Sequence, residues 1–183
     1  VYNENRVHKP HLKVDAGHVP TSWTNAVMTL AEKFAEVKST DILVLASAHA
    51  SVEDNHALAC LLSTLGKGRL AFVPHIVAGA GDGFLLTDDQ APNTSGVRLL
   101  GIDEATADDI AAAAKKAKLV VILADDLVGR GVLKASDLTN AYVVALASNL
   151  HATAHAADLV VPVTTAAEHI GTYVNVDGRA QRT

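Results

Sequence analysis

The sequence has very little cysteine and few aromatic residues, and both shortages restrict what the chain can be. Cys60 is the only cysteine among 183 residues, which excludes an intrachain disulfide and a self-contained Cys₄ iron–sulfur or zinc site. Aromatic residues make up 4% of the chain and hydrophobic residues 49%, so the core must be built from Val, Leu, Ile and Ala. This composition favours buried strands flanked by Ala-rich helices, the α/β pattern.

Positive charge and long apolar runs are also scarce. The 15 Lys and Arg residues are scattered and outnumbered by 20 Asp and Glu, so no basic stripe is available for a phosphate backbone. We therefore expect no nucleic-acid partner. Apolar runs such as residues 119–124 are too short to span a bilayer, so we expect no direct membrane insertion. Because the first residue is Val and not Met, we expect a fragment or a shortened homologue of a longer protein.

The hydrophobic pattern predicts alternating strands and helices. Short apolar runs predict buried strands at residues 41–46, 70–73, 118–123, 141–146 and 158–161. Helices are predicted at 23–37, after Thr21 or Ser22; at 57–65, opened by Asp54 or Asn55 and ended by Gly66; and at 105–117. These elements indicate one α/β domain over residues 1–183, with a mostly parallel, doubly wound sheet flanked by helices.

Three segments of this predicted domain have no clear period. Residues 1–20 are interpreted as an extended lead-in, 76–95 as a long Gly-rich loop, and 164–183 as an irregular C-terminal tail. Cys60 lies in an apolar helical pattern, which predicts a buried and inert thiol.

The two ends of the chain carry motifs that resemble one family. Residues 6–12 (R-V-H-K-P-H-L) and 22–26 (S-W-T-N-A) are similar to the R-x-x-x-P-L and S-W-x-E-A segments of molybdopterin oxidoreductases. Residues 157–162 (A-D-L-V-V-P), 171–175 (G-T-Y-V-N) and 178–181 (G-R-A-Q), with Glu168 between them, resemble the family's A-D-V-V-L-P, E-x-x-G-T-x-x-N and G-R-x-Q segments. The G-T-Y-V-N and G-R-A-Q segments of the tail are most similar to the molybdopterin-like part of the large iron–sulfur subunit of NADH:quinone oxidoreductase, respiratory complex I.

The departures from the family pattern point away from a bound cofactor. Residues 73–77, where catalytic members carry a Cys, selenocysteine or Ser ligand to molybdenum, offer no thiol or hydroxyl. The Cys-rich N-terminal part and a large intervening lobe are missing. Ala124 replaces the Gly of the family's G-x-D/N-P segment and adds a Cβ where a nucleotide needs close approach to the backbone.

The resemblance therefore implies a non-catalytic scaffold domain that binds no cofactor itself and packs against other subunits of the complex I peripheral arm. Iron–sulfur clusters would be bound elsewhere in the full subunit, on the cytoplasmic or matrix face of an energy-transducing membrane. Loss of the intervening lobe predicts an exposed apolar patch, and thus a surface for a partner or for self-association.

Two other functions stay open. The chain could be a molybdopterin guanine dinucleotide-binding domain of a formate dehydrogenase-like oxidoreductase, with Asp125, Asp126, Asn175 and Arg179 as cofactor contacts. It could also be a free-standing nucleotide-binding module. In structural terms, Asp125 and Asp126 would cap a helix or a turn, and Arg179 would pair with Glu168 or bond backbone carbonyls. His151 and His155, spaced for one helix face, are a weak metal motif that lacks a third ligand.

Overall fold

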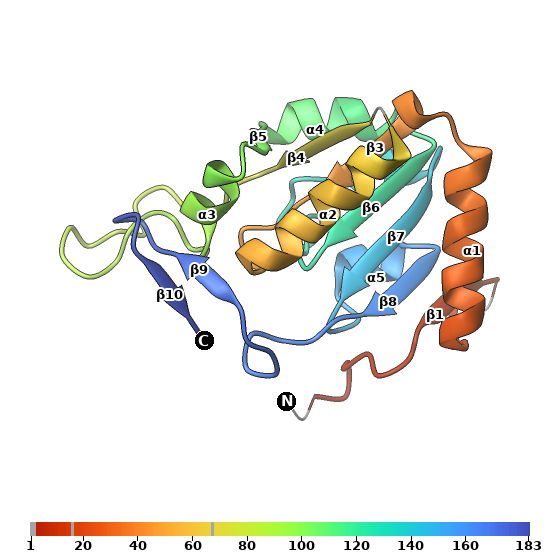
Figure 1. Cartoon of the computed structure of the whole chain (residues 1–183), viewed down its shortest axis with the longest axis horizontal. Helices are drawn as coiled ribbons and strands as arrows, with labels where there is room; N and C mark the ends of the chain where they lie inside the picture. Colours follow the sequence, from red (N-terminus) through yellow and green to blue (C-terminus); the bar gives the residue numbers. More distant parts are fainter. Residues whose placement is uncertain (1–2, 16, 67) are drawn as a thin grey trace.

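The computed structural model describes residues 3–15, 17–66 and 68–183. At its centre, parallel strands pair to form a sheet. The strands are β3 (Ile42–Leu45), β4 (Arg69–Phe72), β6 (Leu119–Leu123), β7 (Tyr142–Ala147) and β8 (Leu159–Pro162). A short β5 (Asp103–Glu104) pairs with β4. The prediction of a mostly parallel α/β sheet is therefore confirmed, and the predicted strands lie within about a residue or two of their observed bounds (Figure 1).

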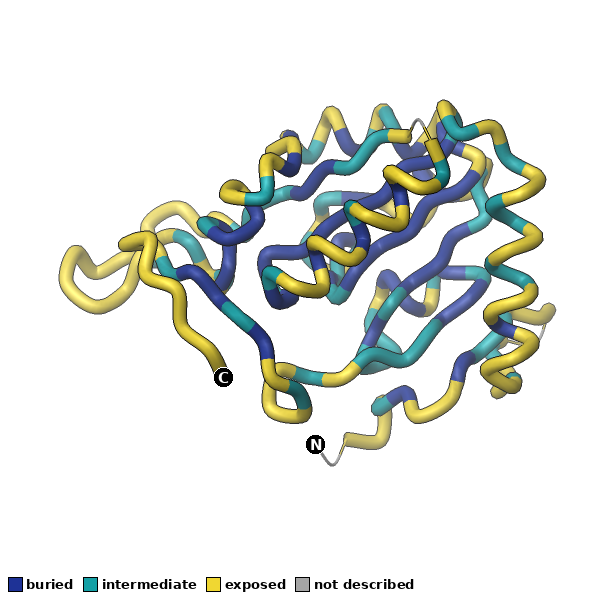
Figure 2. Tube along the Cα trace, viewed as in Figure 1, coloured by how far each residue is buried: buried dark blue, intermediate teal, exposed yellow. Residues whose placement is uncertain are grey.

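Helices cover both faces of this sheet. Helices α1 (Trp23–Glu36) and α2 (Val52–Leu65) pack on one face, against alternate strand residues such as Val44 and Val121. Helices α4 (Ala107–Ala114) and α5 (Ala152–Ala156) lie on the other face, against Leu45 and Ile122 (Figure 1). Because both faces are covered, β3 and β6 are buried along their whole length, as Figure 2 shows.

The N-terminal segment is more ordered than the predicted lead-in. Strands β1 (His11–Val14) and β2 (Gly17–Pro20) form a hairpin, and β1 adds antiparallel to β8 at the sheet edge. Within the described residues the sheet therefore has eight strands in the order β2-β1-β8-β7-β6-β3-β4-β5. The expected lead-in over residues 1–20 thus contains two strands, which the sequence did not predict; its residues 1, 2 and 16 lie outside the described residues.

The C-terminal tail is irregular only in its first part. Strands β9 (Thr172–Val174) and β10 (Ala180–Arg182) form a separate antiparallel hairpin, which the sequence did not predict. The loop after β4 ends in α3 (Thr94–Leu99) and reaches out beside this hairpin as an exposed extension (Figure 2). The described parts of the loop and the tail thus meet at one end of the molecule.

Local signals explain where the helices begin. Ser22 caps α1 by accepting a hydrogen bond from the Asn25 N–H, as predicted. Helix α2 begins at Val52, earlier than predicted, because Ser51 and Asp54 form a reciprocal capping box. The helix ends at Gly66, as predicted, with a φ of 98°.

Candidate functional site

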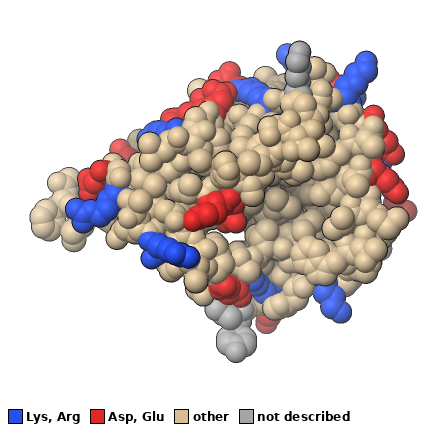
Figure 3. Space-filling model, in the orientation of Figure 1, with Lys and Arg blue, Asp and Glu red and all other residues tan. Residues whose placement is uncertain are grey.

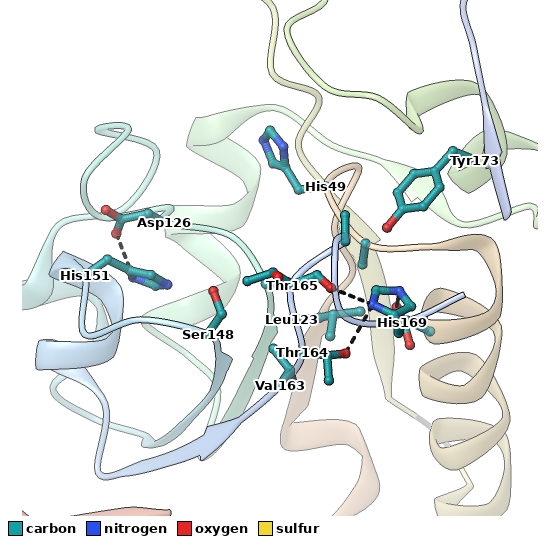
Figure 4. A pocket seen from close by; sticks show the side chains of 14 residues that line it. His49, Leu123, Asp126, Ser148, His151, Val163, Thr164, Thr165, His169 and Tyr173 are labelled. Carbon is teal, nitrogen blue, oxygen red and sulfur yellow. Dashed lines mark hydrogen bonds and ion pairs between the residues drawn. The ribbon is translucent and has the colours of Figure 1, made fainter. Parts of the chain in front are cut away.

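The candidate site lies where the strand order reverses. From β3 the chain proceeds outward to β4 and β5, and then returns to place β6 on the other side of β3. The two loops that leave the carboxyl ends of β3 and β6 diverge there, and open α/β sheets bind ligands at such a point. A cavity of about 280 Å³ lies at this edge (Figure 4). Its lining residues are His49, Ala50, Asp54, Leu123, Ala124, Asp126, Ser148, His151, Val163, Thr164, Thr165, Ala166, His169 and Tyr173.

The loop from β3 to α2 is fixed by Asn55, which is completely buried. The Asn55 side chain donates to the carbonyl oxygens of Ser47 at 2.9 Å and Ser51 at 2.8 Å, and accepts from the Ser47 N–H at 3.0 Å. All of these backbone groups belong to the loop itself or to Ser51, the residue that caps α2. The loop is therefore rigid, and it holds His49 and Ala50 at the cavity wall.

The loop after β6 begins with a strained residue. Ala124 has a φ of 42°, and it is the only non-glycine residue with a positive φ in the described part of the chain. The left-handed region costs a residue with a Cβ about 1–2 kcal/mol. The surroundings hold Ala124 there, because its N–H donates to the Leu146 carbonyl and its own carbonyl accepts from the Ser47 hydroxyl.

Asp125 lies behind the cavity in a buried ion pair. Its Oδ2 accepts from the Arg130 guanidinium at 2.5 Å, and Arg130 also donates to the Pro74 carbonyl at 2.9 Å. The Asp125 side chain is only 3% exposed, and its Oδ1 has no hydrogen-bond partner among the described residues. This pair links the loops after β4 and β6, and it leaves Asp125 out of the cavity lining.

Asp126, by contrast, lines the cavity and joins the loop after β6 to α5. Its Oδ1 accepts from the Thr153 N–H and hydroxyl, both at 2.8 Å, and from the Gly129 N–H at 3.1 Å. The His151 Nδ1 lies 3.2 Å from the same oxygen (Figure 4). Burial works against ionisation of Asp126, but the hydrogen bonds from Thr153 and Gly129 outweigh it and lower the pKa of this carboxyl.

Asn175 and Arg179 do not converge with the two aspartates. Both belong to the turn between β9 and β10, where the Asn175 Oδ1 accepts from the Arg179 N–H at 2.8 Å. Neither residue is part of the cavity lining. The predicted pairing of Arg179 with Glu168 was wrong, because Glu168 pairs with Arg6 at 2.5 Å and the Arg179 side chain is exposed.

The C-terminal tail forms one wall of the cavity, and the sequence did not predict this wall. The chain crosses the beginning of α2 at Gly171, where an added Cβ would lie 2.7 Å from the Ser51 Cβ, so only glycine fits. This close passage brings His169 and Tyr173 to the cavity beside Asp54. The only signal in the sequence was the G-T-Y-V-N segment itself, since no period marks the path of the tail.

Two histidines meet at the rim of the site. His49 Nε2 lies 3.2 Å from His75 Nδ1, and the two rings pack edge to face. Burial is the main cause that lowers the pKa of His49; the Asp125 carboxylate works in the opposite direction, and His75 and Arg130 add to the lowering. His49 is therefore neutral at neutral pH, and one ring can donate to the other.

The other predicted features of this region are structural or exposed. His151 caps α5 by accepting from the Ala154 N–H, while His155 packs against His18, so the two imidazoles do not converge. In the described residues no three His, Cys, Asp or Glu side chains are placed to hold a metal ion. Cys60 is exposed on α2, so the prediction of a buried thiol was wrong.

Among the described lining residues, one hydroxyl contacts an imidazole: the Thr164 Oγ1 lies 3.1 Å from the His169 Nδ1, but this nitrogen also lies 2.9 Å from the Thr165 carbonyl oxygen, a bond that requires a proton on Nδ1. The Ser148 hydroxyl accepts from the Asn149 amide at 3.1 Å, and no described histidine bonds to it. Across the described segments, no helix is both long and apolar enough to cross a bilayer. No protein-family model matches the sequence, and no curated protein matches it, so the family resemblance rests on the motifs alone.

Proposed function

We propose that the chain is a non-catalytic scaffold domain of the large iron–sulfur subunit of NADH:quinone oxidoreductase. In this proposal it packs against neighbouring subunits of the peripheral arm and keeps their electron-transfer centres in register. NADH oxidation and quinone reduction take place elsewhere in the complex, which stands on the cytoplasmic or matrix face of an energy-transducing membrane. The motifs at the two ends of the chain support the choice of complex.

The observation that carries the proposal is an apolar tip formed by Phe84, Leu85 and Leu86 in the loop after β4. These side chains are 88%, 78% and 59% exposed. The tip is nevertheless ordered, because the Asp82 Oδ1 accepts hydrogen bonds from the backbone N–H groups of all three residues, at 2.8 to 2.9 Å. An ordered loop that presents large apolar side chains to solvent is typical of a surface that a partner covers.

The cavity supports the non-catalytic part of the proposal. Its volume of about 280 Å³ lies just below the roughly 300–1,000 Å³ that small-molecule and cofactor sites occupy. Asp125 is held in its buried ion pair with Arg130, so a cofactor contact through Asp125 in the alternative function would first require this pair to break.

The test is co-purification with identified subunits. We expect the tagged chain, produced in a cofactor-proficient host together with the peripheral-arm subunits, to co-purify with them and with NADH:ferricyanide reductase activity. A triple variant, Phe84→Ser/Leu85→Ser/Leu86→Ser, should lose this association without a loss of thermal stability, because the three side chains are exposed. The matched control is Val27→Ser/Met28→Ser on α1, which removes two side chains of similar exposure, 60% and 57%, and should keep the association.

Cofactor content separates the proposal from its alternative. Molybdenum, tungsten and iron are measured in the same preparation, and pterin is measured by fluorescence after acid oxidation. Stoichiometric pterin would overturn the scaffold proposal in favour of the formate dehydrogenase-like alternative. A chain free of pterin that also fails to associate with the peripheral-arm subunits would refute the proposal as well.

A further inference from the structure

The cavity at the end of β3 and β6 contains unpaired polar atoms that no role described above uses. The Tyr173 side chain points into the cavity (Figure 4), and its hydroxyl has no hydrogen-bond partner among the described residues although Tyr173 is only 9% exposed. The His169 Nε2 is likewise buried and unpaired, and it lies 3.6 Å from the Asp54 Oδ2. Leaving buried polar atoms unpaired costs about 1–3 kcal/mol each, which is a reason to expect a ligand there.

These free atoms are mainly acceptors. The His169 Nδ1 lies 2.9 Å from the Thr165 carbonyl oxygen, which can only accept, and 3.1 Å from the Thr164 hydroxyl, which can accept or donate; the shorter contact is a hydrogen bond only with the proton on Nδ1. In the neutral ring Nε2 is therefore an acceptor. The carboxylates of Asp54 and Asp126 add further acceptor oxygens to the lining. A ligand that satisfies this set must be rich in donors.

The charge of the lining favours the same class of ligand. Among the described residues that line the cavity, Asp54 and Asp126 are carboxylates and none is Lys or Arg. Figure 3 shows acidic side chains where α2 begins, the position of Glu53 and Asp54 in its first turn. The positive end of α2 would otherwise attract an anion, but these carboxylates already neutralise it. Burial raises the pKa of Tyr173, and the charges of Asp54 and Glu53 add to this, so the hydroxyl stays neutral.

We propose that this cavity binds a small organic cation, with a primary ammonium group held by the carboxylate of Asp54 and the free atoms of His169 and Tyr173. The volume of about 280 Å³ lies just below the roughly 300–1,000 Å³ of sites for drug-sized molecules, which suits a small ligand. Such a ligand is much smaller than a nucleotide, so this binding is independent of the scaffold role.

The probe is 1,4-diaminobutane, compared with 1,4-butanediol as a neutral molecule of the same length and succinate as an anion. Amide NMR shifts are followed on titration of the full chain. We expect saturable shifts with the diamine at the loops that carry His49, Asp126 and His169, and no saturable shifts with the diol or succinate. Equal responses to the diamine and the diol, or no saturable response to the diamine, would overturn the proposal.

Two variants sharpen this test. Tyr173→Phe removes a hydroxyl that makes no hydrogen bond in the described protein, so it should fold as well as the parent yet bind the diamine about tenfold more weakly. Asp54→Asn should also weaken binding about tenfold or more through the lost charge. Tyr142→Phe, at the start of β7 and outside the cavity lining, is the matched control and should bind like the parent. Undiminished diamine affinity in a folded Tyr173→Phe variant would count against the assigned site.

Discussion

The Glu53 carboxylate accepts two hydrogen bonds from Thr172, one from its backbone N–H at 2.8 Å and one from its hydroxyl at 2.7 Å. Glu53 stands in the first turn of α2 and Thr172 begins β9. The two bonds therefore fasten the C-terminal hairpin to the helix that borders the cavity. Because both bonds end on Glu53, the attachment of the hairpin should depend on the ionisation of this carboxyl group.

We expect the hairpin to loosen in acid. The hydrogen bond from the Thr172 backbone is the main cause that lowers the pKa of Glu53 from 4.5 to about 2. A group with a lowered folded pKa stabilises the fold above its ordinary pKa, and this contribution is lost as the pH falls towards the folded value. Hydrogen–deuterium exchange at residues 172–174, corrected for intrinsic rates, should therefore accelerate between about pH 5 and pH 2. Glu53→Gln should exchange faster at neutral pH and lose most of this acid dependence; an unchanged acid response in that variant would show that another group controls it.

Replacing Arg130 should strongly destabilise the protein. Arg130→Met leaves the Asp125 carboxylate buried without its partner, at a cost of about 3–5 kcal/mol in the free energy of unfolding. The double variant Asp125→Asn/Arg130→Met removes the charge as well and should regain a large part of this loss. Urea denaturation of both variants measures the difference, and equal stabilities would mean that the ion pair is not coupled as its geometry indicates.

The Thr153 hydroxyl should contribute to the free energy of unfolding. This buried hydroxyl donates to Asp126 and accepts from the Val128 N–H at 2.9 Å. Thr153→Ala leaves the N–H of the half-buried Val128 and the Asp126 carboxylate without this partner, and should cost about 1–3 kcal/mol in thermal or urea unfolding. Thr153→Ser keeps the hydroxyl and should recover most of the stability. Failure of serine to rescue would assign the loss to the methyl group and not to the hydrogen bonds.

Ala124→Gly should slightly stabilise the chain. Relief of the left-handed strain is worth about 1–2 kcal/mol. The greater freedom of glycine in the unfolded state costs about 0.4–1 kcal/mol. The net gain of up to about 1.6 kcal/mol should appear as a higher urea midpoint. Ala147→Gly, in a buried strand with ordinary geometry, should do the opposite, so a loss of stability at both positions would argue against strain at Ala124.

The sequence predicted those parts of the fold that depend on local apolar runs. The runs at 41–46 and 118–123 are buried on both faces in the sheet, so their assignment did not depend on long-range pairing. The hairpin of β1 and β2 was missed because its residues are mixed in polarity, and β1 is a strand through its pairing with β8. The start of α2 was misread because Asp54 and Asn55 are typical caps, whereas Asp54 supports the Ser51 cap and Asn55 fixes the preceding loop.

The candidate site was predictable only where it follows a strand. Asp126 comes directly after β6, and strand ends meet at one edge of a parallel sheet, so its place at the cavity could be inferred. His169 and Tyr173 reach the same cavity because the tail turns back across α2 at Gly171. That path depends on a close contact between residues far apart in the chain, which no local pattern encodes.

The pairing of β1 with β8 also affects the order in which the molecule can be completed during synthesis. Leu12 lies opposite Leu159, so this edge of the sheet can close only after β8 has left the ribosome. Until then the N-terminal hairpin has no neighbour in the sheet, and a lone two-stranded hairpin is marginally stable in water. The growing chain therefore exposes an unpaired strand until β8 has emerged, and nascent-chain chaperones that shield β1 and β2 should raise the yield of folded protein.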